Sequence, residues 1–143
     1  MVRCIAYNGG YKYQLKKTHT VAIEIQPSEA IHTDYVDLDC AGNLTMQKGY
    51  AWDGPSGPTI DTLTFMRGSL VHDALYQLMR EECLDHNLYR EAADRILRRI
   101  CVEDGMCRIR AWWVYHAVRL CANPAADPAD KRPVTLAPKG CEP

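Results

Sequence analysis

The histidine, aspartate and tyrosine of segment 71–76 are the residues of this sequence whose types and spacing best suit chemistry. The segment reads VHDALY. In a helix, positions i and i+4 place His72 above Tyr76, with Asp73 adjacent on the same flank. An imidazole can act as a general base and a neighbouring carboxylate can bind a cation. This side of the predicted helix is therefore a candidate catalytic surface.

A second carboxylate, Asp94, lies close to the apolar stripe of the next predicted helix. Burial of an unpaired carboxylate is costly, so Asp94 is expected to have a buried partner. The short connection at 83–87 favours an antiparallel helix pair, in which Asp94 faces His72 or Tyr76. Asp94 bonded to one imidazole nitrogen would leave the other free as a general base. We therefore predict a catalytic group of His72, Asp94 and Tyr76.

The segment 49–58, GYAWDGPSGP, contains three glycines and two prolines in ten residues, which predicts a shaped loop. Its carbonyls, together with Asp53 and Asp73, are hard oxygen ligands suited to a divalent cation such as calcium or manganese. A cation or backbone groups would then polarise the bond that a water activated by His72 attacks. The candidate loop and substrate-binding residues are Trp52, Gly54, Ser56 and Gly57.

These motifs resemble a family of short phage and prophage proteins that is known only as a domain of unknown function. The family pattern is an Asp-x-x-Ser-x-Pro loop, an His-Asp-x-x-Tyr helix and a later Ala-Asp helix. Its places are filled here by Asp53, Ser56, Pro58, His72, Asp73, Tyr76 and Asp94. The resemblance covers about residues 35–120. It implies a phage or prophage origin and supplies no activity.

A local likeness to secreted phospholipase A2 concerns the same residues. In that family a Gly-rich calcium loop precedes a helix with His-Asp-x-Cys-Tyr, and an aspartate on an antiparallel helix orients the histidine. The likeness would make His72 the base, Asp73 a metal ligand, Tyr76 a support and Asp94 the orienting group. Leu75 stands where that family has a disulfide cysteine. The likeness is therefore local, of the kind that convergence produces.

The elements that must position these residues follow from the hydrophobic periodicity. Alternation around 11–15 and 21–25 predicts strands, and 35–39 and 44–47 flank a Gly-Asn turn that predicts a β-hairpin. Helical patterns run from Asp61 or Thr62 to about Glu82, from 85–87 to Gly105, and from about Met106 to Ala122. The predicted apolar face of the third helix consists of Ile109, Trp112, Trp113, His116, Ala117 and Leu120.

The predicted fold class is α+β, with N-terminal antiparallel strands or hairpins, a Gly/Pro-rich loop and a three-helix C-terminal half. We expect a single domain over residues 1–122 and a Pro-rich C-terminal tail over 123–143, because five prolines after Asn123 leave no regular pattern.

Composition excludes several classes of function. The 17 Lys and Arg residues nearly balance the 18 Asp and Glu residues, which disfavours nonspecific binding to nucleic acid. No apolar run is long enough for a membrane span or a signal peptide, so we expect a cytoplasmic protein of an infected or lysogenic bacterium. The seven cysteines form no C-x-x-C pair and are expected to be reduced thiols rather than zinc ligands or disulfides.

The leading functional hypothesis is a metal-assisted hydrolase of a small ester or phosphodiester. The first alternative is a non-catalytic phage accessory protein that binds a host protein or a small signalling molecule, including a host-defence inhibitor. The second is a virion or assembly component. Catalysis requires a water-accessible His72 bonded to Asp94, whereas the other hypotheses predict a filled-in polar cluster or a concavity elsewhere. In those hypotheses the cluster would fix the packing of two helices.

Overall fold

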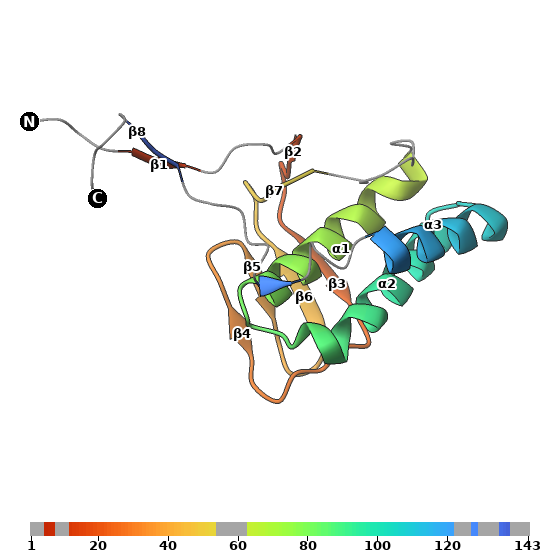
Figure 1. The fold of residues 1–143 in the computed structure, drawn as a ribbon, viewed down its shortest axis with the longest axis horizontal. Coiled ribbons are helices and arrows are strands. Elements are labelled where there is room, and N and C mark those ends of the chain that lie inside the picture. Colours follow the sequence, from red (N-terminus) through yellow and green to blue (C-terminus); the bar gives the residue numbers. More distant parts are fainter. Residues whose placement is uncertain (1–4, 8–11, 54–62, 122–126, 129–134, 138–143) are drawn as a thin grey trace, which may run out of the picture.

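The computed structural model describes residues 5–7, 12–53, 63–121, 127–128 and 135–137 of the chain (Figure 1). The strands are β1 (Ile5–Tyr7), β2 (Tyr13–Gln14), β3 (His19–Ala22), β4 (Ile31–His32), β5 (Val36–Leu38), β6 (Asn43–Met46), β7 (Ala51–Trp52) and β8 (Thr135–Ala137). The helices are α1 (Leu63–Arg80), α2 (His86–Glu103) and α3 (Arg108–Cys121). The predicted α+β class, with antiparallel strands before three helices, is confirmed.

The main sheet has the strand order β3-β6-β5-β4, and all of its neighbours are antiparallel. The predicted hairpin is β5–β6, and its turn uses Gly42 at a φ of +89°. A Cβ at this position would lie 2.4 Å from the carbonyl oxygen of Ile23, so the turn requires glycine. The Asp39 carboxylate accepts a hydrogen bond from the Asn43 backbone N–H at 2.8 Å and closes the turn.

One face of this sheet supports the helices. Its alternate residues are buried and form the main core with the apolar side of α1 and with Ala93, Ile96 and Ile100 of α2. The other face carries polar side chains such as Thr20 and Thr45. This alternation is the pattern expected of an antiparallel sheet that is covered on one side only. Figure 1 shows α1 lying across the sheet, with α2 beside α1 and α3 beyond it.

The first two helices approach each other closely, and this fixes the positions of the polar residues between them. Asp85 caps α2 by accepting a hydrogen bond from the Asn87 backbone N–H at 2.9 Å. Gly68 allows the close contact, because a Cβ there would lie 2.8 Å from the Sγ atom of Cys101. Gly105, at a φ of +101°, ends α2 as predicted.

The structure differs from the sequence-based expectation in the segment 49–58. Ala51 and Trp52 form β7, which pairs antiparallel with β2, so Trp52 is a strand residue rather than a loop residue. Most of the glycines and prolines of this segment follow Asp53, so they leave the backbone N–H groups of 51–52 available for a ladder. Residues 54–58 lie outside the described residues.

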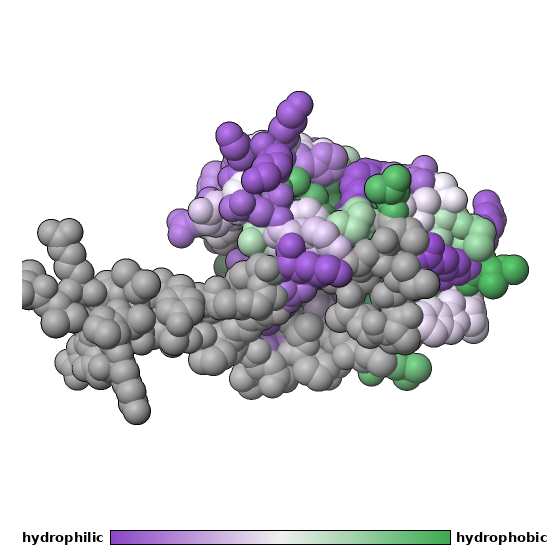
Figure 2. All heavy atoms as spheres, turned by 90° about the horizontal axis from the view of Figure 1, so that it is seen from above, coloured by the Kyte–Doolittle hydropathy of each residue, from purple (hydrophilic) through white to green (hydrophobic). Residues whose placement is uncertain are grey.

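The prediction of the buried face of α3 is wrong. Ile109, Trp112, Trp113 and Leu120 are exposed, with Ile109 83% exposed, whereas Ala111 and Val114 are buried against α1 and α2. Both stripes have helical spacing, and the buried one carries the smaller side chains. Figure 2 shows hydrophobic side chains projecting at the end of the molecule where α1 begins and α2 turns into α3.

Within the C-terminal segment that was expected to lack regular structure, β8 pairs antiparallel with β1. Of the cysteines whose side chains are described, Cys40, Cys83, Cys101 and Cys107 are free thiols. None of the described helices has an apolar stretch sufficient to cross a membrane.

Candidate functional site

The predicted contact between the first two helices is present. The His72 Nε2 atom lies 2.6 Å from Asp94 Oδ1, and the Tyr76 hydroxyl donates to the same oxygen at 2.6 Å. The rings of His72 and Tyr76, one helical turn apart, have their centroids 4.1 Å from each other. An ionised carboxylate only accepts hydrogen bonds, so Nε2 of His72 carries a proton and Nδ1 is the remaining nitrogen.

Arg119 of α3 completes this network and was missed by the sequence analysis. Its Nη1 donates to Asp94 Oδ2 at 2.9 Å. Asp94 of α2, which is fully buried, therefore accepts from three donors on two other helices: His72 and Tyr76 of α1 and Arg119 of α3. The sequence offers one signal for Arg119. A buried carboxylate such as Asp94 needs a cationic partner, and Arg119 lies on the same stripe of its helix as the apolar residues Ala111 and Val118.

The electrostatics of the network keep Asp94 ionised and Tyr76 protonated. Burial alone would raise the pKa of Asp94, but the hydrogen bond and charge of His72, with the hydrogen bonds of Tyr76 and Arg119, lower it below its ordinary value. Burial, followed by the charge of Asp94, raises the pKa of the Tyr76 hydroxyl. Only 6% of the His72 surface is exposed. The three side chains predicted to be catalytic thus form a closed polar cluster.

Asp73 and Asp53, the predicted metal ligands, lie together beside His72. The Asp53 backbone N–H bonds to the Asp73 carboxylate, and both residues are partly exposed. Burial raises the pKa of Asp73 to about 6; the charge of His72 opposes this rise and the charge of Asp53 adds to it. Among the described residues, no group of three or more His, Cys, Asp or Glu side chains could hold a metal ion. Further oxygen ligands would have to be backbone carbonyls, groups outside that part of the chain, or water.

The predicted loop residues fall into two sets. Trp52 is buried, and its Nε1–H donates to the Ser69 hydroxyl at 3.2 Å, while that hydroxyl donates to the Met66 carbonyl at 2.8 Å. This contact ties β7 to α1 one turn before His72. The other candidates, Gly54, Ser56 and Gly57, lie outside the described residues.

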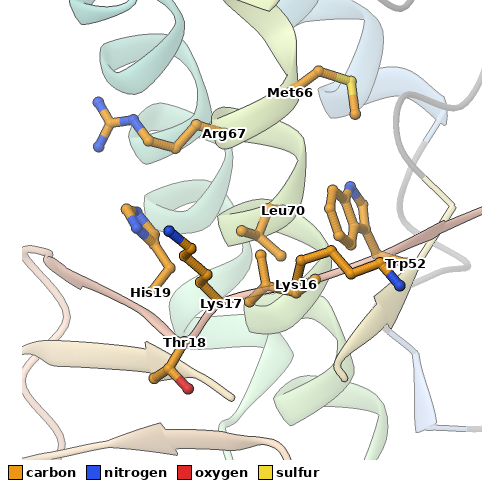
Figure 3. Close-up of a pocket in the computed structure, with 9 residues that line it drawn as sticks. Lys16, Lys17, Thr18, His19, Trp52, Met66, Arg67 and Leu70 are labelled. Carbon is orange, nitrogen blue, oxygen red and sulfur yellow. The ribbon is translucent and has the colours of Figure 1, made fainter. Parts of the chain in front are cut away.

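On another side of α1, an open groove of about 600 Å³ was not anticipated from the sequence. It is lined by residues 15–19, by Trp52, and by Met66, Arg67 and Leu70 of α1 (Figure 3). Leu15, Trp52, Met66 and Leu70 supply apolar surface, and all four belong to or pack against the main core. The volume falls within the range of small-molecule sites. No local motif reveals the groove, because three distant segments form it.

Comparison with known proteins gives one match. No curated protein and no solved structure matches the chain. The model of one protein family, described as a protein of unknown function (DUF1353), matches residues 31–118, which is more than half of the 143 residues. The matched range contains the whole His72–Asp94 network except Arg119. The chain therefore belongs to the DUF1353 family of proteins of unknown function.

Proposed function

We propose that this protein is a non-catalytic accessory protein, encoded by a phage or prophage, that binds a small molecule in the groove between residues 15–19, Trp52 and α1. The phage setting rests on the resemblance of the loop and helix motifs. Such a protein would act by sequestering a small molecule of the host cell. The observation that carries the proposal is the open apolar groove, which contrasts with the closed His72–Asp94 cluster.

The closed cluster weighs against general-base catalysis by His72. A general base must reach its substrate or a water directly. Only 6% of the His72 surface is exposed, and the Asp94 carboxylate that holds it also accepts from Tyr76 and Arg119. Networks of this kind fix the packing of helices and determine a unique core. In the proposed function, the cluster holds α1 in position and thereby fixes one wall of the groove.

The groove has the features of a preformed ligand site. Its apolar wall includes Trp52, which is anchored by the hydrogen bond to Ser69 and by ring contacts with Tyr13 and Tyr50. A rigid aromatic wall costs little entropy on binding because its side chain is already ordered. Leu70, only 4% exposed, is likewise held by the core.

The test is a titration of the protein with 4-phenylbutanoate and 4-phenylbutan-1-ol, followed through the methyl resonances of Met66 and Leu70. A ligand of about 12 heavy atoms at about 0.3 kcal/mol per atom gives a dissociation constant of roughly 2 mM. Met66→Trp, which fills the groove, should abolish the shifts of the Leu70 methyl groups. Leu63→Trp is the matched control, because Leu63 lies on the same helix, 91% exposed and outside the groove. Absence of methyl shifts with both probes would overturn the proposal.

A second candidate function is a hydrolase of a small ester or phosphodiester centred on Asp53 and Asp73. It is favoured by one observation: the partly exposed Asp73 has a pKa of about 6, close to the value that suits acid–base chemistry at neutral pH. With calcium or manganese bound, the two carboxylates would hold the ion. Titration with each ion should then raise the melting temperature of the protein but not of Asp73→Asn. Equal responses of the two proteins would remove this candidate.

A further inference from the structure

The rim of the groove carries two lysines that no acidic side chain pairs with in the part of the chain that the structure describes. Lys16 and Lys17 are exposed, line the groove, and form no ion pair within the described part of the chain. In Figure 3 the Lys16 side chain extends toward Trp52 and the Lys17 side chain extends toward His19. The Lys16 ammonium group therefore lies on the Trp52 side of the groove and the Lys17 ammonium group on the His19 side, and both border it.

Arg67, the third cationic residue that lines the groove, is paired with carboxylates. The unpaired positive charge of the groove therefore lies on the side formed by residues 15–19. The Nε–H of Arg67 is shared between the two carboxylate oxygens of Asp104, at 3.1 and 3.0 Å, and its Nη2 donates to Asp104 at 2.9 Å and to Glu103 at 3.0 Å. Its guanidinium points away from Trp52 in Figure 3. The 15–19 segment thus supplies the charge, while Trp52 and α1 supply the apolar wall.

His19 adds a polar atom that lacks a partner. Its Nε2 is buried and makes no hydrogen bond in the described part of the chain. Buried polar atoms in folded proteins are nearly always satisfied by protein, water or a ligand. Since His19 lines the groove beside Lys17, a headgroup bound there would lie next to the imidazole ring and the Lys17 ammonium group.

We infer that the ligand of this groove is a small amphipathic anion, with an aromatic or aliphatic body against Trp52, Met66 and Leu70 and a carboxylate or phosphate headgroup at Lys16, Lys17 and His19. This inference rests on the proposed function, because it assumes that the groove is a ligand site. It specifies the charge of the ligand and the residues that recognise it. Charge complementarity between the two lysines and the headgroup is the feature that selects an anion over a neutral ligand.

The test compares four probes that share one phenylbutyl body: 4-phenylbutanoate, 4-phenylbutyl phosphate, 4-phenylbutan-1-ol and 4-phenylbutylamine. Dissociation constants are measured from the methyl shifts of Met66 and Leu70 at low ionic strength. Each ammonium–anion contact near 4 Å in a water-like medium gives about a fivefold gain. Both anions should therefore bind at least fivefold more tightly than the alcohol, and the amine more weakly. The ratio of the two anions identifies the preferred headgroup.

Substitutions test which side chains recognise the anionic headgroup. Lys16→Gln and Lys17→Gln should each reduce the preference for the anions about fivefold without changing the affinity for the alcohol. Lys48→Gln is the matched control, since Lys48 is exposed in the same half of the chain but does not line the groove. Added salt should weaken binding of the anions only. His19→Phe should weaken binding of the anions and leave that of the alcohol unchanged.

The outcomes separate this inference from the proposed function. If the alcohol shifts the same methyl groups and binds as tightly as the anions, or if the amine binds best, the groove is a ligand site and the anion inference is wrong. If none of the four probes shifts the methyl groups, the groove is not a ligand site and both conclusions fail. An unchanged preference for the anions in both lysine variants would also overturn the inference.

Discussion

Replacing Asp94 with alanine should destabilise the fold more than any surface change on the same helix. The substitution leaves the buried donors of His72 and Tyr76 without an acceptor and removes the counter-charge of Arg119. Removing one partner of a buried ionic network typically costs about 3–5 kcal/mol. In a chain of this length, such a loss lowers the melting temperature by roughly 10 °C or more. The free energy of unfolding would be measured by urea titration with circular dichroism.

The control is Glu91→Ala, which removes an exposed carboxylate from α2 and breaks its i,i+4 ion pair with Arg95. Exposed pairs of this kind contribute about 0.5 kcal/mol. A double-mutant cycle with Arg119→Gln should show strong coupling, so that the double variant costs little more than Asp94→Ala alone. If Asp94→Ala and Glu91→Ala cost the same, within about 1 kcal/mol of the parent protein, the cluster is not the buried network described and the reasoning is refuted.

Three further changes test separate parts of the structure. Because the pKa of Asp73 is raised from 3.8 to about 6, the unfolded chain binds fewer protons between these values and stability falls as pH rises through them. Asp73→Asn should therefore raise the free energy of unfolding at pH 7 by up to about 3 kcal/mol and leave the free energy of unfolding at pH 4 unchanged. Equal effects at both pH values in urea titrations would contradict this. Gly68→Ala should lower the free energy of unfolding by about 1–3 kcal/mol, because its Cβ would lie 2.8 Å from Cys101 Sγ. Adding Cys101→Ala should restore part of this loss. Full stability of Gly68→Ala in the same assay would be the contrary result. Burial raises the pKa of the Cys101 thiol to about 12, so iodoacetamide should modify Cys101 far more slowly than the exposed Cys107 in native protein. Peptide mass spectrometry would measure the two rates. Equal rates would mean that the contact region of α1 and α2 opens freely.

The part of the site that lies on α1 and α2 could be predicted because its spacing is local. His72 and Tyr76 share a face at i and i+4, and a five-residue connection forces the two helices to run antiparallel, so Asp94 returns to their level. A carboxylate among alanines on an apolar stripe then has few alternatives to an inward position. The β5–β6 hairpin could be predicted for the same reason, because Gly42 and Asn43 determine it within a few residues.

The remaining features depend on contacts that no local pattern encodes. Two stripes of α3 have helical spacing, and hydrophobicity favours the one with Trp112 and Trp113, yet the stripe with Ala111 and Val114 is the one buried against α1 and α2. Arg119 could be assigned only once that crossing was known. The groove depends on the β2–β7 ladder, which brings the chain near residue 15 to Trp52 across more than thirty residues of sequence.

The attachment of α3 has a consequence for native-state hydrogen exchange. This helix buries Ala111 and Val114 and is held at its C-terminal end by polar contacts: Arg119 bonds to Asp94, and Arg90 donates to the carbonyl oxygen of Val118 at 3.2 Å. Since α1 buries far more apolar surface, amides of α3 should exchange through smaller openings than those of α1. Each such opening removes a donor from Asp94. The pKa of Asp94, which the hydrogen bond of Arg119 helps to lower, is thus coupled to a local unfolding equilibrium of α3.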